Sequence, residues 1–142
     1  MNVLPKLGMQ EVPFGMPEAN LIKLLGPPAA EQTLGDVENH PKSRRVLEYV
    51  ERTFLVTPEL GVISITFENL PVSLWGTEIS EMSPSELAKF LTSKQCDVSV
   101  GEPDGWGDQD VESRGYGIIA SFCKGRLECI EIYNPTWRDN RH

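Results

Sequence analysis

The residues best suited to chemistry in this sequence are the carboxylates of one short acidic segment, residues 101–112. Five carboxylates there surround a single tryptophan, Trp106. They are Glu102, Asp104, Asp108, Asp110 and Glu112. An indole provides a large contact area in protein interfaces, and carboxylates steer association with a cationic partner. We therefore predict that these six residues form the partner-binding site, on a loop too rich in glycine to be a helix.

The sequence alone leaves two other interpretations of the acidic segment open. Loops of this composition are commonly solvated connections, and the tryptophan would then fold back onto the core. Alternatively, the spacing of Asp108, Asp110 and Glu112 resembles the start of a calcium-binding loop. That loop needs Gly at its sixth position and Glu at its twelfth, where this chain has Ser113 and Ile119. We therefore expect no metal site.

Candidate catalytic residues are few. The two histidines, His40 and His142, have no metal-ligand spacing. The three cysteines are Cys96, Cys123 and Cys129, and an odd number cannot pair fully within one chain, so we expect small buried thiols in a reducing compartment. The sequence has no nucleophile elbow, phosphate loop or dinucleotide motif. We therefore predict no enzymatic activity and no cofactor, with a small hydrolase using His40 or Cys96 as an alternative.

Composition and charge limit the remaining function classes. The chain has 142 residues, of which 39% are hydrophobic and 24% charged, and these values predict one soluble globular domain. The net charge of −8 excludes a general nucleic-acid binder, which needs a cationic surface. Most of the excess lies in residues 72–112, which hold two bases and nine acids. No apolar run approaches the roughly 20 residues of a membrane span, and no export signal is recognisable, so we expect a cytoplasmic protein.

An internal repeat indicates which elements position the acidic segment. The residues of Met16–Leu25 align without gaps on those of Met82–Leu91, and both segments read as short one-sided helices. Ser83, Pro84 and Glu86 have the types and spacing of an N-terminal capping box in the second copy. In the first copy, Pro17 would open the helix and Gly26-Pro27-Pro28 would end it. Leu21, Leu24 and Leu25 are expected to face the core, as are Leu87, Phe90 and Leu91.

Strand candidates follow each helix. They are Val46–Val56, for which a helix is the weaker alternative, Val62–Phe67, Tyr116–Phe122 and Leu127–Tyr133. Turns are expected at Thr57–Gly61 and Lys124–Arg126, and long polar loops at Gly26–Ser43 and Asp97–Arg114. The register of the last strand is ambiguous. The predicted fold class is α+β, a sandwich-like single domain (residues 1–142) of two helix-plus-antiparallel-strands units, 1–71 and 72–142, that meet near Leu70–Glu81.

A short motif resembles known bacterial families. Val12–Met16 ends in Gly-Met before the first helix, and Leu24–Pro28 closes it with Leu-Gly-Pro-Pro. This arrangement is similar to that of the small lipoproteins of outer-membrane assembly, although the chain has no lipobox cysteine. The tandem αβ inhibitor of β-lactamases has a related layout, and small immunity proteins encoded beside secreted toxins also resemble it. The resemblance implies a binding protein of tandem αβ fold.

These observations predict a cytoplasmic bacterial immunity protein, an antitoxin of the kind used in contact-dependent inhibition. It would bind and occlude a cognate protein toxin, a basic one such as a nuclease, and would contact neither nucleic acid nor membrane. The alternative is a non-catalytic adaptor or scaffold that binds a peptide or small ligand between its two halves. The sequence specifies no oligomeric state, although exposed edge strands could pair between copies.

Overall fold

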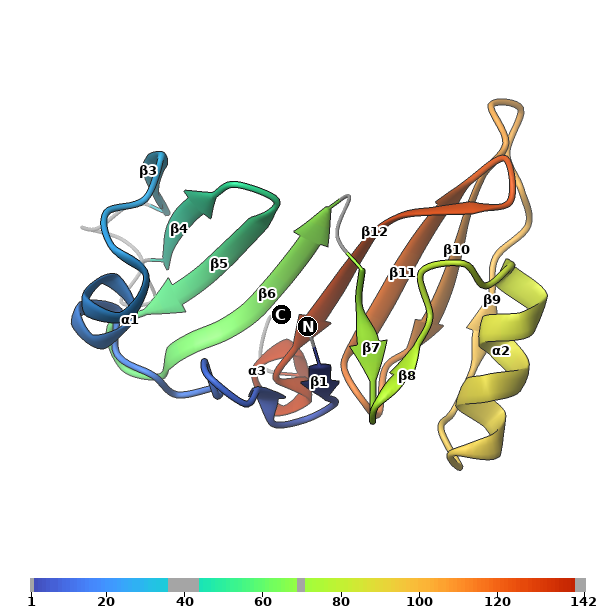
Figure 1. Cartoon of the computed structure of the whole chain (residues 1–142), viewed down its shortest axis with the longest axis horizontal. Coiled ribbons are helices and arrows are strands. Elements are labelled where there is room, and N and C mark those ends of the chain that lie inside the picture. Colours follow the sequence, from blue (N-terminus) through green and yellow to red (C-terminus); the bar gives the residue numbers. More distant parts are fainter. Residues whose placement is uncertain (1, 36–43, 69–70, 140–142) are drawn as a thin grey trace.

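The computed structural model describes residues 2–35, 44–68 and 71–139, without the side chains of residues 138 and 139. Two β-sheets and three helices make up this described part of the chain (Figure 1). The larger sheet is built from β3 (Ala30–Leu34), β4 (Arg44–Tyr49), β5 (Arg52–Thr57), β6 (Gly61–Glu68), β9 (Ser99–Val100), β10 (Asp108–Ser113), β11 (Ile118–Cys123) and β12 (Arg126–Tyr133). The smaller elements are β1 (Asn2–Leu4), β2 (Gly8–Met9), β7 (Ser73–Leu74), β8 (Thr77–Glu78), α1 (Glu18–Leu25), α2 (Pro84–Ser93) and α3 (Pro135–Asp139).

The larger sheet joins the two halves of the chain edge to edge. Its strand order is β3-β4-β5-β6-β12-β11-β10-β9, and all neighbours are antiparallel. The last strand of each half, β6 and β12, meets the other at the centre, where Ile65 lies opposite Ile132. The small sheet also joins the halves, because β1 pairs with β7 in parallel. A fold of mixed helix and mostly antiparallel sheet is therefore confirmed, but strands predominate over helix.

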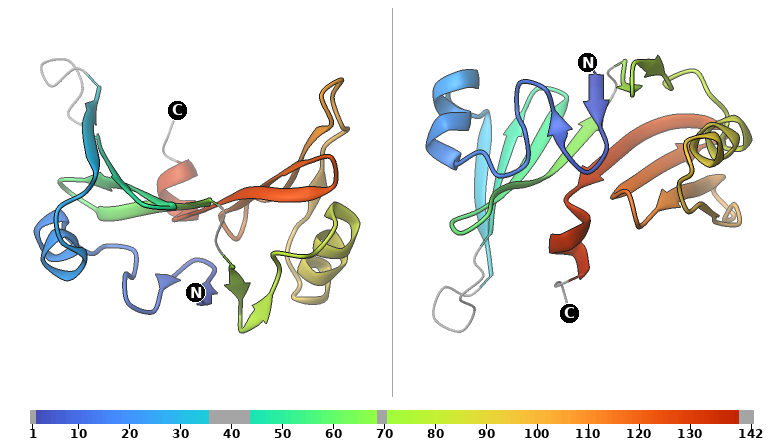
Figure 2. Two further views of the ribbon diagram at one scale, coloured as in Figure 1. Left: turned by 45° about the horizontal axis from the view of Figure 1, so that its top comes forward. Right: turned by 90° about the horizontal axis from the view of Figure 1, so that it is seen from below.

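The core lies on one face of the larger sheet. Helices α1 and α2 and the small sheet cover that face, and α3 lies on the opposite side (Figure 2). Leu21 of α1 and Leu87 and Leu91 of α2 are fully buried in one cluster with sheet residues such as Phe54 and Ile132. Both ends of the sheet turn away from α1 and α2 (Figure 2, left), so the opposite surface is concave. We call the strand residues that point away from α1 and α2 the concave face.

Strand alternation decides which residues belong to each face, because successive side chains point to opposite sides. Val111, Ala120, Ile130 and Phe67 are paired in one row across four strands, and all are buried against the helices. Their neighbours along each strand therefore form the concave face. Beside the central strands β6 and β12, where α3 follows β12, Ile63, Tyr133 and Trp137 are buried outside the main core cluster (Figure 2, left).

The predicted helix ends are confirmed. The Oγ of Ser83 accepts a hydrogen bond from the Glu86 N–H at 3.1 Å, and the Glu86 carboxylate accepts one from the Ser83 N–H at 3.0 Å. Pro17 is the N-cap of α1, and Gly26 ends it at a φ of +83°, a conformation that favours glycine. One core assignment is wrong, because Leu24 is 52% exposed.

The segment Val46–Val56 is a hairpin rather than a single strand. It is divided between β4 and β5, and the turn lies at Val50 and Glu51, where Glu51 has a φ of +66°. A non-glycine residue rarely adopts that conformation, and neither Val50 nor Glu51 is of a type that predicts a turn. The turn at Thr57–Gly61 and the strand at Val62–Phe67 are confirmed as the β5–β6 connection and β6. Strand β11 begins at Ile118, two residues later than expected.

Both expected polar loops contain strands. Gly26–Ser43 includes the edge strand β3, and Asp97–Arg114 includes β9 and β10. These strands carry few apolar residues because much of their surface contacts solvent, which is why their composition resembled that of a loop. The expected junction near Leu70–Glu81 holds β7 and β8, while residues 69 and 70 lie outside the described part.

A bulge resolves the ambiguous register of β12. Ser121 lies opposite Cys129 and Phe122 opposite Leu127, so Glu128 is an extra residue. The bulge lets Leu127, Ile130 and Ile132 all contact the core, which uniform alternation would forbid.

Candidate protein-binding face

The predicted acidic site spans a strand and the hairpin connection before it. Asp108, Asp110 and Glu112 lie on β10, so residues 108–112 are strand and not loop. They alternate with the buried Val111 and therefore point together onto the concave face. Glu102, Asp104 and Trp106 lie in the β9–β10 connection, which rises at the rim of the concave face (Figure 2, left). An extended strand is also the wrong geometry for a calcium-binding loop.

Trp106 does not fold back onto the core, because it is 82% exposed. The connection that carries it is nevertheless ordered by Asp104. One oxygen of that carboxylate accepts hydrogen bonds from the Trp106 N–H at 2.8 Å and the Asp108 N–H at 2.9 Å. The Gly107 carbonyl accepts a further bond from the Lys124 N–H at 2.9 Å, which ties the connection to the β11–β12 turn. An exposed indole on an ordered support loses little entropy when it binds.

In-register pairing extends the acidic surface across the sheet. One row runs from Glu112 through Ile119, Glu131, Thr66 and Thr53 to Glu48. A second row joins Asp110 to Glu68 through Ser121 and Cys129. The acids on the concave face within the described residues are Glu48, Glu68, Asp108, Asp110, Glu112, Glu128 and Glu131. Strand alternation places two bases, Arg44 and Arg126, on the same face.

Local contacts show how these acids are held. Glu131 accepts a hydrogen bond from the Ser64 hydroxyl at 2.7 Å, across the central strand pair. Glu112 lies 3.9 Å from Arg114, whose side chain is 86% exposed. The better-formed ion pair is on the other face, where Arg45 joins Glu18 of α1 at 3.0 Å. The concave face therefore keeps a strong excess of negative charge.

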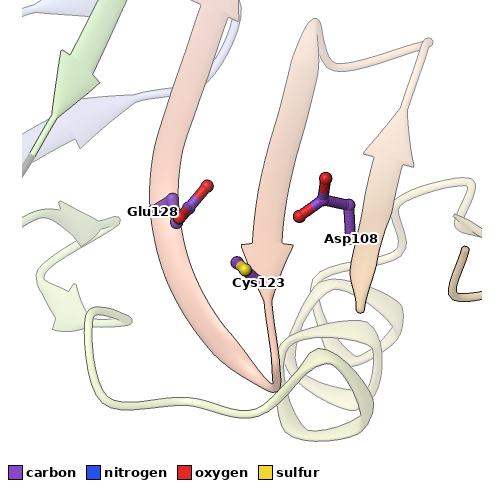
Figure 3. A group of neighbouring side chains, drawn as sticks. All are labelled: Asp108, Cys123 and Glu128. Carbon is purple, nitrogen blue, oxygen red and sulfur yellow. The ribbon is translucent and has the colours of Figure 1, made fainter. Parts of the chain in front are cut away.

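Three adjacent strands bring Asp108, Cys123 and Glu128 together (Figure 3). One ligand atom of each residue lies within 4.8 Å of the others, so among the described residues this group could hold a metal ion. A hydrogen bond with the Asp108 carboxylate, and then desolvation, raise the pKa of the Cys123 thiol. A thiol with a raised pKa is a poor nucleophile at neutral pH.

The other catalytic candidates do not form a site in the described residues. All three cysteines are half-buried and free. Cys96 packs beside the core as expected, whereas Cys129 lies on the concave face, and desolvation raises the pKa of both thiols. His40 and His142 lie outside the described part of the chain. The raised pKa makes the Cys96 thiol a weaker nucleophile at neutral pH.

The sequence-based site omitted four acids of the concave face, namely Glu48, Glu68, Glu128 and Glu131. Residues 113–142 hold five bases and three acids, so charge counting pointed away from β12. The pairing of β12 between β6 and β11 is what brings Glu131 into line with Glu112. The alignment of Glu131 with Glu112 therefore depends on the register of β10, β11 and β12, which the sequence alone does not show.

In comparisons with known proteins, no family model, no curated protein and no solved structure matches this chain. Within residues 2–35, 44–68 and 71–139, the structure has no helix of the length and apolar character needed to cross a membrane.

Proposed function

We propose that this chain is a cytoplasmic immunity protein that binds and occludes a cationic toxin domain. Binding uses the concave face together with Trp106 on the β9–β10 connection. The mechanism is steric and electrostatic occlusion, without turnover and without a cofactor. The toxin domain is basic because its active site handles phosphate groups, as a nuclease site does.

The observation that carries this proposal is the charge of the concave face. Among the described residues, seven carboxylates and two arginines occupy strand positions on this face that a monomer does not need for its core. A concentration of like charge gives a field that speeds encounter with an oppositely charged protein. Trp106, exposed at the rim of the same face, supplies the apolar anchor that such interfaces contain.

The arrangement of the chain supports a rigid binding platform. Each half supplies one helix followed by four strands of the large sheet, and this order is consistent with a tandem repeat of two related αβ units. Because β6 and β12 pair directly, the large sheet continues without a break from one half to the other. A partner that docks on a continuous sheet meets groups already in their bound positions.

The test uses a toxin gene encoded next to that of this chain. Expression of the toxin domain alone should arrest growth, and co-expression of this chain should restore it. The double reversal Asp108→Lys/Asp110→Lys should slow association at least about tenfold at low salt, because electrostatic steering contributes factors of about 10 to 1000. The matched control Glu11→Lys/Glu59→Lys makes the same charge change at exposed positions outside the concave face.

Equal association rates for both double variants would overturn the electrostatic mechanism. Growth rescue that survives Trp106→Ala together with the reversal would remove the concave face as the binding site. Binding of a peptide or small ligand, with no effect on any toxin, would favour the adaptor function instead.

A further inference from the structure

A cavity of about 250 Å³ lies beside the centre of the molecule. It is bounded by β6 and β12 on one side and by the β7–β8 segment on the other. Phe67, Val72 and Leu127 form part of its apolar wall. It is smaller than the roughly 300 to 1000 Å³ typical of cofactor and drug-sized ligand sites, so its size suits one side chain.

The cavity combines that apolar wall with carboxylates. Glu78 and Glu81 line it from the β7–β8 side, and Glu128 lines it from the bulge in β12, with its carboxylate directed toward Asp108 and Cys123. All three acids are exposed, and no lysine or arginine is among the described residues that line the cavity. A partly open cavity that combines an apolar wall with exposed acids fits a ligand with an aliphatic stem and a cationic head.

We propose that this cavity binds an arginine side chain of the protein partner. Guanidinium is preferred over ammonium because it is more weakly hydrated and offers several N–H donors to more than one carboxylate. The cavity lies on the β7–β8 side of the large sheet, but two of its lining residues, Glu128 and Cys129, also belong to the concave face, so the cavity borders that face. The inference rests on the proposed function for the origin of the arginine, but arginine binding itself can be measured without a partner.

The probe is N-acetyl-arginine methylamide, titrated into the whole protein and followed by amide chemical shifts. We expect a dissociation constant in the millimolar range, with shift changes centred on Val72, Leu127 and Ile130. The norleucine analogue keeps the stem but lacks the charge, and methylguanidinium keeps the head but lacks the stem. Both should bind at least about tenfold more weakly, because the cavity contacts both parts of the side chain.

Variants locate the site. Glu78→Gln/Glu81→Gln should weaken binding of the arginine probe about tenfold, whereas Glu11→Gln/Glu59→Gln, with the same change in net charge, should leave it unchanged. Equal weakening in both variants, or shift changes spread over β10, would overturn the cavity as the site. If methylguanidinium binds as tightly as the arginine probe, the side-chain proposal is wrong. A positive probe titration with no toxin binding would refute the proposed function alone.

Discussion

Neutralising one acid of the concave face should make the isolated protein more stable. Asp110 lies between Asp108 and Glu112 on the same side of β10, and all three carboxylates point onto the concave face. Like charges in this arrangement repel one another in the free protein. The acidic surface that we propose for a cationic partner therefore lowers folding stability, and Asp110→Asn should remove part of that cost.

The size of the effect follows from strand geometry. Residues two apart along an antiparallel strand are separated by about 6.8 Å. Two unit charges at that distance repel by about 0.6 kcal/mol in water, so the two neighbours of Asp110 together contribute about 1 kcal/mol at low salt. With a Debye length of about 8 Å at 0.15 M salt, screening reduces the sum to about 0.5 kcal/mol.

Urea unfolding at about 0.01 M and about 0.15 M salt measures both values. Glu59→Gln is the control, because Glu59 is exposed in the β5–β6 turn outside the concave face. We expect Asp110→Asn to raise the free energy of unfolding more at low salt than at high salt, and Glu59→Gln to change it little. A variant that is less stable than the parent, or whose stability change is independent of salt, would refute the reasoning.

Four further outcomes are expected. Ser83→Ala should lower the free energy of unfolding by about 1 kcal/mol, because it removes the side-chain cap of α2, and urea unfolding measures this. Hydrogen bonds with the Ser83 backbone and hydroxyl lower the pKa of Glu86, so its contribution to stability is present above the unfolded-state pKa and is lost as pH falls through the folded value. The free energies of unfolding of the parent and of Glu86→Gln, measured as pH is lowered, should therefore converge at low pH. Trp106→Ala should leave thermal stability unchanged, since the side chain is 82% exposed, yet weaken toxin binding at least about tenfold by calorimetry. Gly117→Ala should abolish native folding by circular dichroism, because a Cβ there would collide with the Tyr133 carbonyl and φ is +70°.

Local signals predicted α1 and α2 well, whereas α3 was not predicted. The Ser83 cap, the N-terminal Pro84 and the Gly26 terminator depend on interactions within a few residues, so their types and spacing suffice. The exposed Leu24 is the exception, because burial on a helix depends on what the sheet beneath it covers. A short helix at the margin of the core buries fewer residues than its periodicity suggests.

Strand pairing is non-local, so the sequence did not predict which strands are neighbours or their register. Strand β10 resembles a loop in isolation, because of its residues only Val111 and Ser113 are fully buried. The bulge at Glu128 is visible only from the pairing of β12 with β11. The six-residue acidic site was therefore predicted without its neighbours on β12, β6 and β4, since those neighbours are set by register and not by spacing.

The association rate of this chain with the toxin domain that we propose as its partner, measured as a function of ionic strength, tests the central claim most directly. The account predicts a rate that falls steeply as salt rises, and a loss of that dependence in Asp108→Lys/Asp110→Lys but not in Glu11→Lys/Glu59→Lys. A rate that is independent of salt, or one that the reversal on β10 leaves unchanged, would contradict it.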